Sequence, residues 1–377
     1  MIENPGILWT IGAFILVLGP LVFVHEFGHY IVARWCGVKS DIFSIGFGRE
    51  VAGFTDKHGT RWKFGWLPLG GYVQFAGDMN PVSQPGDIEP DATAAERAHM
   101  FQYQPIWKRA AIVFAGPAIN FIFAFLILMG FGLVYGQSVT PPVVGQVVEG
   151  SAAEQAGLKA GDRIVSANGD RITVFQDIVS SVALQVREPV KLVIERDGAS
   201  RELIVTTREL VEKDRFGNEF RRGFIGVSPG KPQWADVSLL EAPGYAWRQT
   251  VVILDTMVEG LKQIITGKRT IKDLGGPLKI AKQSGESAAI GVEAFIFLIA
   301  LISINLGFIN LLPLPMLDGG HLLFYAIEAV RRKPANPKVQ EWAFRFGFAA
   351  VATLFLVVTF NDLESFGVWK RIVGLIG

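Results

Sequence analysis

Cysteine is almost absent from this sequence, since Cys36 is the single one among 377 residues. One thiol excludes an internal disulfide and a cysteine-rich metal site. An excess of charge is also lacking, because the formal net charge at pH 7 is only +1. This balance offers no global electrostatic attraction to nucleic acid. We therefore expect no nucleic-acid partner.

Charged residues are scarce as well, at 19%, whereas half of the residues are hydrophobic. This composition is too apolar for an ordinary soluble protein and too charged for a protein that lies wholly in the membrane. It indicates a protein of the lipid bilayer with one sizeable aqueous part.

Long apolar runs are abundant. A membrane-spanning helix needs roughly 20 apolar residues, and three uncharged runs reach that length, while a fourth reaches it only with residues 342–345. The first run has no basic region before it and no signal-peptidase-like site after it, so we expect a retained helix. The predicted spans lie between Glu3 and His25, at 110–136, at 294–317 and around 346–361.

Lysine and arginine near the ends of the spans predict the orientation of the chain. They are concentrated between spans one and two, for example at Lys39, Arg49 and Lys108, and again in the link that contains Lys333 and Lys338. Both links are therefore predicted to be cytoplasmic and both termini external. The long segment between spans two and three is then external.

The composition of this external segment differs from that of the apolar spans. Short β-branched runs alternate there with glycine, aspartate and asparagine. Two helical patterns interrupt the runs, "SAAEQAG", with Ser151 as its N-cap, and "FQDIVSSVALQ". The order of these elements, with "AGLKAGDRIVSANG", resembles a PDZ domain of the bacterial protease type at 140–210. The predicted strands lie at 143–148, 163–167, 190–195 and 202–206.

PDZ domains bind an extended peptide or a chain end by strand addition. We expect such a partner here, with residues 143–148 as the candidate binding edge. A spacer or lid that binds no peptide is the alternative. The role of the following residues, 211–288, cannot be derived from their pattern.

Ionisable residues interrupt the first span at "FVHEFGHYIV", residues 23–32. "HEFGH" has the form H-E-x-x-H, which places His25 and His29 on one helix face, where both imidazoles reach one metal ion. Glu26 is adjacent but is not a ligand, and it can act as the general base toward water on that metal. Imidazole ligands favour Zn²⁺. A pair of core histidines is the alternative, but an unpaired charge in lipid costs at least about 2.5 kcal/mol.

A catalytic zinc ion normally has three protein ligands, so a third residue is needed. His58 and His99 lie in the polar cytoplasmic segment. Asp318 follows the long uncharged run of the third span and needs a partner there for the same energetic reason. We predict Asp318 as the third ligand, with His321 as its rival.

The end of the third span reads "NLLPLPMLDGGH". Pro313 and Pro315 break a helix, and Gly319 and Gly320 permit an unusual backbone path. Irregular backbone at membrane depth occurs where it lines a cavity or is buried in protein. The pattern therefore predicts a broken helix beside the metal.

Several motifs together resemble the site-2 protease family of intramembrane zinc metalloproteases, and most nearly its bacterial regulator of sigma-E protease (RseP) type. They are "HEFGH", "NLLPLPMLDGG", the PDZ-like insert, "AGPAINF" at 115–121, and "FSIGFG" with "WLPLGGYVQF". The resemblance covers nearly the whole chain. It departs from the family in having one PDZ domain where the best-known members of this type have two.

The resemblance implies an endopeptidase that cuts transmembrane segments of single-pass membrane proteins after a prior site-1 cut, such as an anti-sigma factor or a signal-peptide remnant. It implies zinc on His25, His29 and Asp318, with Glu26 as the base. It also implies a multi-pass protein of the bacterial inner membrane, with a periplasmic PDZ domain and an active site near the cytoplasmic face.

The resemblance also implies that Asn310 helps to hold the substrate or the developing oxyanion. Its alternative role is a hydrogen bond between helices, like those expected for Asn120 and Ser303. A β-hairpin at 41–76, with "DKHG" as its turn, could capture unwound substrate as an added strand. The alternative is a hairpin that only packs against the helices. The remaining candidate substrate-binding residues are Gly46, Gly48, Pro313 and Pro315.

The expected fold is an α-helical polytopic membrane protein with about four transmembrane helices, a membrane-associated β-hairpin and an inserted α+β PDZ domain. A catalytically silent membrane scaffold or a metal carrier is the alternative function. A carrier should show a polar path on both sides of the metal, and a silent scaffold should have lost Glu26. The expected parts are an N-terminal membrane part at 1–136, the PDZ domain at 140–210, an external region at 211–288 and a C-terminal membrane part at 289–377.

Overall fold

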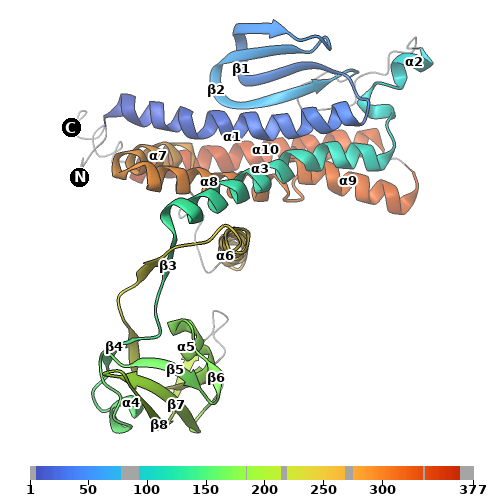
Figure 1. The fold of residues 1–377 in the computed structure, drawn as a ribbon. Helices are drawn as coiled ribbons and strands as arrows, with labels where there is room; N and C mark the ends of the chain where they lie inside the picture. The colour runs from blue at the N-terminus through green and yellow to red at the C-terminus, as the bar shows by residue number, and fades with distance from the viewer. Residues whose placement is uncertain are drawn as a thin grey trace, which may run out of the picture. The chain divides into compact units, whose positions relative to one another are not determined.

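The computed structural model describes residues 6–77, 93–183, 185–213, 219–267, 275–333 and 336–365. The chain divides into two compact units, which can be followed in Figure 1. The helical unit comprises Met1–Gly132 and Leu239–Gly377, and the inserted unit comprises Leu133–Ser238.

Four helices among the described residues are long and apolar enough to cross a membrane. A helix satisfies its backbone hydrogen bonds internally, which is why such runs can span lipid. The predicted fold class, a helical polytopic membrane protein, is confirmed. The four helices are α1 (Ile7–Trp35), α3 (Ile106–Tyr135), α8 (Val292–Asn310) and α10 (Pro337–Ser365).

The third spanning helix is shorter than its uncharged run, because α8 ends at Asn310 and not at residue 317. The prolines in the run have no N–H to donate, so the helix cannot continue through them. The chain turns and begins α9 (Asp318–Arg331). A Cβ atom on Gly319 would overlap the carbonyl oxygens of Leu311 and Leu312. Only glycine allows the turn to pack this closely against the start of α9.

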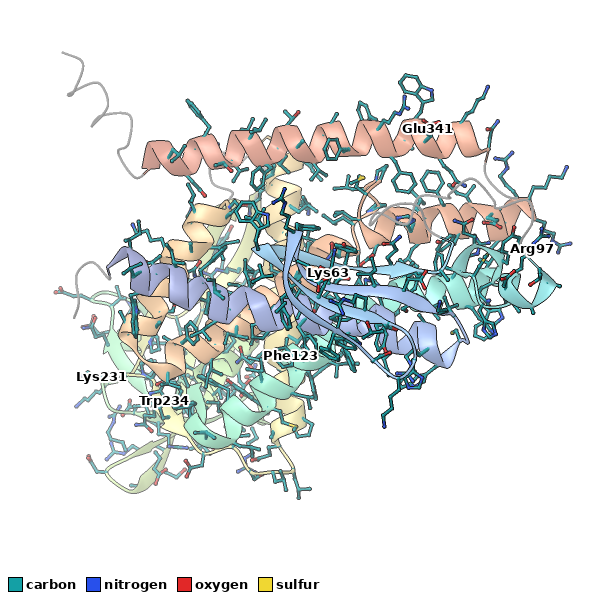
Figure 2. The ribbon with its side chains drawn as sticks, turned by 90° about the horizontal axis from the view of Figure 1, so that it is seen from above. Lys63, Arg97, Phe123, Lys231, Trp234 and Glu341 are labelled. Carbon is teal, nitrogen blue, oxygen red and sulfur yellow. The ribbon has the colours of Figure 1, made fainter. Side chains whose placement is uncertain are left out.

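Two long strands, β1 (Ser40–Thr55) and β2 (Arg61–Phe75), form the predicted hairpin. Figure 1 shows this sheet alongside α1, and Figure 2 shows Lys63 on the sheet and Phe123 on α3. Residues 42–45 pair with both 61–64 and 71–74. Among the described residues, 71–75 therefore lie at one edge of the sheet.

The turn of the hairpin is fastened to α1 through Asp56. Its carboxylate accepts hydrogen bonds from the Tyr30 hydroxyl at 2.9 Å and from the Trp62 indole at 3.0 Å. Burial alone would raise the pKa of Asp56, but these bonds and those from the backbone of His58 and Thr60 lower it to about 2. The carboxylate is thus ionised throughout the neutral range and holds the hairpin on the helix.

Two further helices of the helical unit pack against the spanning helices. In α6 (Ala242–Ile265), Ala246 and Ile253 share an apolar cluster with α3 and α8. In α7 (Pro277–Ile290), the Gly285 carbonyl accepts a hydrogen bond from the Trp9 indole of α1 at 3.2 Å. The structure therefore groups the described residues from Leu239 onward with the helical unit, so the predicted region 211–288 is divided between the two units. That this region is external stays a prediction. Short helices α2 and η1 lie at Ala94–Arg97 and Phe101–Tyr103.

The inserted unit contains a four-stranded antiparallel sheet with the order β6-β5-β7-β8. All four predicted strands and both predicted helices are present, and the Ser151 side chain caps α4 by accepting from the Glu154 N–H. The elements are β4 (Val144–Val147), α4 (Ala152–Gln155), β5 (Arg163–Ala167), β6 (Asp170–Arg171), α5 (Phe175–Ala183), β7 (Pro189–Arg196), β8 (Ala199–Thr206), β9 (Arg208–Lys213), β10 (Glu219–Phe224) and β11 (Val227–Pro229). At its two ends, β3 (Gln137–Val139) pairs with β12 (Gln233–Ala235).

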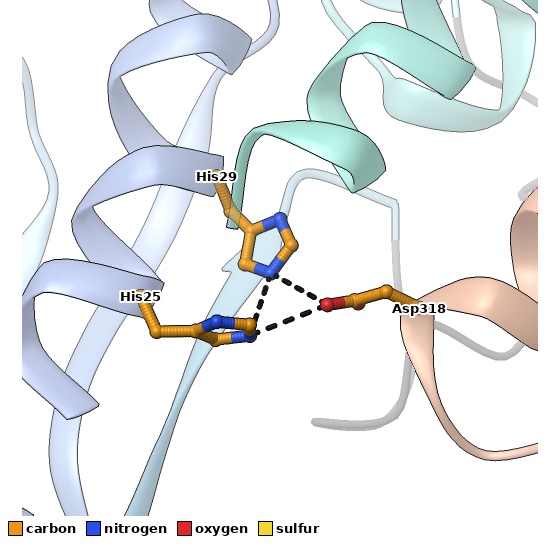
Figure 3. Close-up of side chains that lie close together, drawn as sticks. All are labelled: His25, His29 and Asp318. Atoms are coloured by element: carbon orange, nitrogen blue, oxygen red, sulfur yellow. Dashed lines mark hydrogen bonds and ion pairs between the residues drawn. The ribbon is translucent and has the colours of Figure 1, made fainter. Parts of the chain in front are cut away.

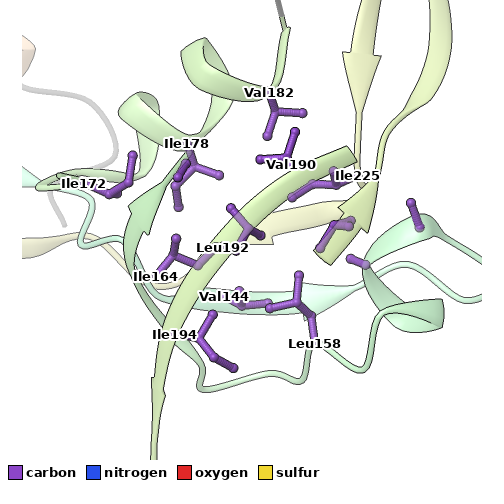
Figure 4. Packing of buried hydrophobic residues seen from close by; sticks show 14 of the residues in the cluster. Val144, Leu158, Ile164, Ile172, Ile178, Val182, Val190, Leu192, Ile194 and Ile225 are labelled. Carbon is purple, nitrogen blue, oxygen red and sulfur yellow. The ribbon is translucent and has the colours of Figure 1, made fainter. Parts of the chain in front are cut away.

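Alternating residues of these strands face one core, as period-two patterning requires. Ile164, Leu192 and Ile194 are fully buried there, and Figure 4 shows them packed with neighbours from α5. Ile225 joins this core from outside the PDZ segment that the sequence suggested. The inserted unit is therefore completed by residues beyond 210.

Candidate active site

His25, His29 and Asp318 converge, although more than 280 residues separate the histidines from the aspartate. The Nε2 atoms of the two histidines lie 3.3 Å apart. Asp318 Oδ2 lies 3.3 Å from Nε2 of His25 and 3.5 Å from Nε2 of His29. Figure 3 shows the two imidazoles projecting from α1 toward the carboxylate at the start of α9. Among the described residues, this is the one group of three or more such side chains close enough to hold a metal ion.

The spacing of the three atoms fits a tetrahedral zinc ion. Zn–N and Zn–O bonds of about 2.0–2.1 Å at tetrahedral angles separate the ligand atoms by about 3.3–3.4 Å. Asp318 Oδ2 is buried and has no hydrogen-bond partner, and such an atom is costly unless something else satisfies it. A cation among the three atoms would satisfy it. The donor set, two imidazoles and one carboxylate, is one that zinc accepts.

Close contact between α1 and α3 builds the site. Gly28 lies between the histidines, and a Cβ atom there would come within 2.5 Å of the Ala115 carbonyl oxygen. A Cβ atom on Gly116 would overlap the His29 ring. Small residues let two helices approach each other closely. The "AGPAINF" stretch of α3 thus leaves room for the imidazoles.

The second nitrogen of each imidazole also has a partner on α3. His29 Nδ1 lies 2.9 Å from the Ile112 carbonyl oxygen, and His25 Nδ1 lies 3.0 Å from the amide Nδ2 of Asn120. The sequence suggested a contact between helices for Asn120 and nothing for Ile112. Nothing local to either residue points to an imidazole, because only the packing of α1 against α3 brings them to the histidines.

Glu26 lies beside these groups and interacts electrostatically with both histidines and with Asp318. A Cβ atom on Gly71 would lie 2.9 Å from Glu26 Cγ. The sheet edge formed by residues 71–75 therefore passes against the predicted general base. Gly71 was not identified from the sequence.

The other histidines lie outside the converging group. The ring centre of His321 is 4.8 Å from that of Phe344 on α10. His58 Nε2 lies 2.8 Å from an Arg34 guanidinium nitrogen, and His99 Nδ1 lies 2.9 Å from the Gly37 carbonyl oxygen. The geometry thus favours Asp318 over its rival His321.

The predicted substrate-binding residues fall into two places. Asn310 is the half-buried last residue of α8, and Pro313 and Pro315 follow in the segment that leads to Asp318. Gly46 and Gly48 lie in β1 with φ values of 87° and 86°. Glycine adopts this conformation readily, so both positions are explained by the bend of the hairpin. Substrate contact at these five residues stays a prediction.

An ion pair anchors the helix that carries Asp318. The Arg109 guanidinium of α3 donates to the Glu328 carboxylate of α9 at 2.8 Å and lies 4.9 Å from the centre of the Tyr325 ring. The two paired side chains are only 16% and 15% exposed. A desolvated pair of this kind holds two helices in one register.

We expect Glu328→Ala to lower the free energy of unfolding by about 2 kcal/mol, because it leaves Arg109 poorly solvated and unpaired. The apparent melting temperature in detergent should fall by about 4 °C. Glu341→Ala is the matched control, since its pair with Arg345 is 53% and 63% exposed and should matter by less than about 0.5 kcal/mol. Equal shifts for the two variants would contradict the anchoring role.

The inserted unit has a pocket of about 200 Å³ between α5 and residues 222–227. Phe175, Ile178 and Val182 line one side, and Ile225 lies on the other. The candidate peptide-binding edge at 143–148 is wrong, because β4 already pairs with β11 and Val143 bridges to Arg163.

Comparison with known proteins agrees with this site. The model of Peptidase family M50 matches residues 13–354. "Putative zinc metalloprotease Atu1380" of Agrobacterium fabrum is 42% identical over 357 residues, covering 93% of this chain and 95% of that protein. "Metalloprotease MmpA" of Caulobacter vibrioides is 36% identical over 395 residues, covering 98% and 99%. A solved PDZ domain of an SdrC-like protein from Listeria monocytogenes matches 24% of this chain and 87% of its own, with 19% identity and a TM-score of 0.20.

The family match spans both histidines of the first helix and the aspartate that reaches them from α9. It also spans most of the four apolar helices. The chain belongs to peptidase family M50, the site-2 protease family, and is an intramembrane zinc metalloprotease.

Proposed function

We propose that this protein is an endopeptidase that cuts the transmembrane segments of single-pass membrane proteins after an earlier cut in their external part. The observation that carries the proposal is the spacing of His25, His29 and Asp318, which suits a zinc ion. These residues lie on or beside helices apolar enough to span lipid. A site in that position suits a substrate that is itself in the membrane.

Each residue of the site has a role in this proposal. His25 and His29 would hold the zinc ion through Nε2, and Asp318 would hold it through Oδ2. When bound, zinc lowers the pKa of a water molecule to about 7 and polarises a carbonyl group. Glu26 takes the proton of the attacking water and delivers it to the amine that leaves. Asn310 donates its amide N–H groups to the substrate or to the oxyanion that develops on it.

Substrate must be unwound before it is cut, since a spanning helix buries its peptide bonds in its own hydrogen bonds. Residues 71–75 offer a sheet edge that passes against Glu26. An extended substrate added to this edge would satisfy its freed backbone groups and lie beside the general base. The hairpin thus presents the scissile bond to the site.

The inserted unit would act on the other side of the membrane. The distribution of lysine and arginine favours a periplasmic inserted unit, external termini and a site near the cytoplasmic face of a bacterial inner membrane. The pocket beside α5 is lined by apolar side chains, among them Phe175, Ile178 and Val182, together with Arg222, and it would take the side chain of a newly exposed chain end. In this account the unit screens substrates by size or by chain end.

We expect Val179→Lys, which places a charge in this pocket, to weaken binding of a chain-end peptide at least about tenfold, because an ammonium group resists desolvation. Ile204→Lys is the control, since Ile204 is 68% exposed on β8. Binding of a fluorescent peptide to the full-length protein measures the effect. If both variants bind like the wild type, the pocket is not the peptide site.

Cells that carry Glu26→Gln test the proposed function as a whole. Membrane proteins trimmed on their external side should accumulate as fragments that retain their transmembrane segment, and mass spectrometry of the membrane fraction identifies them. The wild-type strain should lack these fragments. A membrane proteome that does not differ between the two strains would contradict the proposal.

A further inference from the structure

One face of α3 lies against both imidazoles of the site. Ile112, Gly116 and Asn120 are spaced by four residues, so they lie along one side of the helix. The two histidines on α1 have the same spacing. Ile112 contacts the site through its carbonyl oxygen, and Asn120 does so through its side-chain amide. Gly116 has no side chain, and the His29 ring occupies the space where its Cβ atom would be.

The His29 ring is fixed from two sides. Its Nδ1 lies 2.9 Å from the Ile112 carbonyl oxygen, which can only accept, so Nδ1 carries a proton, and in the neutral ring Nε2 has its lone pair toward Asp318. The ring also lies where a Cβ atom of Gly116 would be. The backbone of α3 therefore sets both the orientation and the tautomer of His29.

In the part of the chain that the structure describes, the neighbour of His25 Nδ1 is the Asn120 side chain and not a backbone carbonyl. Asn120 is fully buried, with Nδ2 3.0 Å from His25 Nδ1. Its Oδ1 is buried without a hydrogen-bond partner. A half-turn of the amide brings Oδ1 to the position of Nδ2. In that orientation the amide accepts a hydrogen bond from a proton on Nδ1, which leaves the Nε2 lone pair of His25 free for a metal ion.

We propose that Asn120 is a positioning residue for the metal centre, which holds His25 in the tautomer and ring orientation that direct Nε2 at zinc. The proposal rests on His25 being a zinc ligand, as in the proposed function. Outer partners of this kind orient metal-bound imidazoles, and their loss typically costs about 10- to 100-fold in metal affinity. Asn120 does for His25 what the Ile112 carbonyl does for His29.

A contact between helices is the simpler role for a buried asparagine, and the structure separates the two roles. The Ser303 hydroxyl of α8 donates to the backbone carbonyl oxygen of Asn120 at 2.8 Å. That bond joins the helices without using the Asn120 side chain. Ser303→Ala therefore removes a helix contact at the same place and leaves the amide beside His25.

The test measures zinc affinity by competition with a chromophoric chelator in detergent, on full-length protein reloaded after metal removal. We expect Asn120→Leu to weaken zinc binding about 10- to 100-fold. Asn120→Asp, which supplies an acceptor to His25, should restore the affinity to within about threefold of the wild type. Ser303→Ala should leave the affinity unchanged. If Asn120→Leu does not fold, Asn120→Ala provides the same comparison with less bulk.

The melting temperature of the metal-free proteins supplies a second readout, because a contact between helices would change stability and not zinc affinity. Unchanged zinc affinity in Asn120→Leu or Asn120→Ala, with loss of affinity in His25→Ala, would overturn the positioning role alone. Wild-type affinity in His25→Ala would overturn the proposed ligand set and the positioning role with it. Failure of Asn120→Asp to restore affinity would show that an acceptor at this position is not what His25 needs.

Discussion

Asp318→Ala is expected to abolish zinc retention and proteolysis together. Oδ2 of this carboxylate is the third corner of a triangle with sides of 3.3, 3.3 and 3.5 Å. Without it two imidazoles remain, and two ligands do not make a stable catalytic zinc site. A bound metal supplies several kcal/mol of transition-state stabilisation, so cleavage should fall by at least about a thousandfold. Metal analysis of purified protein should find about one zinc ion per wild-type chain and almost none in the variant.

His321→Ala is the control for this experiment. His321 is three residues from Asp318 and was its rival from the sequence, but its ring packs on Phe344. We expect this variant to keep its zinc. Full zinc in Asp318→Ala, together with loss of zinc in His321→Ala, would show that the third ligand is the histidine.

Glu26→Gln is expected to separate chemistry from metal binding. The amide has nearly the shape of the carboxylate, and Glu26 is not part of the converging trio, so the zinc content should stay at the wild-type level. Loss of a general base typically costs about 10²- to 10⁴-fold. We therefore expect cleavage of a purified single-pass substrate to fall by at least about a hundredfold.

Glu50→Gln is the matched control, because Glu50 lies in β1 as an exposed partner of Arg61. It should cleave at the wild-type rate. Wild-type cleavage by Glu26→Gln would remove Glu26 from the mechanism. Loss of zinc from Glu26→Gln would show that this residue helps to hold the metal.

The sequence predicted those parts of the molecule that a short stretch of neighbouring residues determines by itself. Uncharged runs long enough to span lipid predicted α1, α3 and α8, and a shorter apolar run extended by residues 342–345 predicted α10. Period-two runs and turn residues predicted the hairpin and the strands of the inserted unit. The H-E-x-x-H spacing and the energetic cost of Asp318 in an apolar run were sufficient to suggest three residues that the structure brings together.

Other features depend on partners distant in the sequence. Nothing local to Asn120 distinguishes a helix contact from a bond to His25 Nδ1, because only the α1–α3 crossing decides it. Residues 71–75 form a sheet edge because residues 42–45 pair with both 61–64 and 71–74, which requires both long strands to bend. Ile225 completes the core of the inserted unit, although in the sequence the hairpin of β9 and β10 lies between it and the strands that form the rest of this core. The position of α7 against α1 likewise depends on Trp9 and Gly285, which are 276 residues apart.

The measurement that tests the central claim most directly is the position of the cut. Purified protein and an externally trimmed single-pass substrate would be reconstituted together in liposomes, and the products sequenced by mass spectrometry. We predict one or a few cuts inside the transmembrane segment, lost after zinc removal, restored by added zinc and absent with Glu26→Gln. Cuts confined to the aqueous flanks of the segment, or cleavage that persists without zinc, would contradict the account.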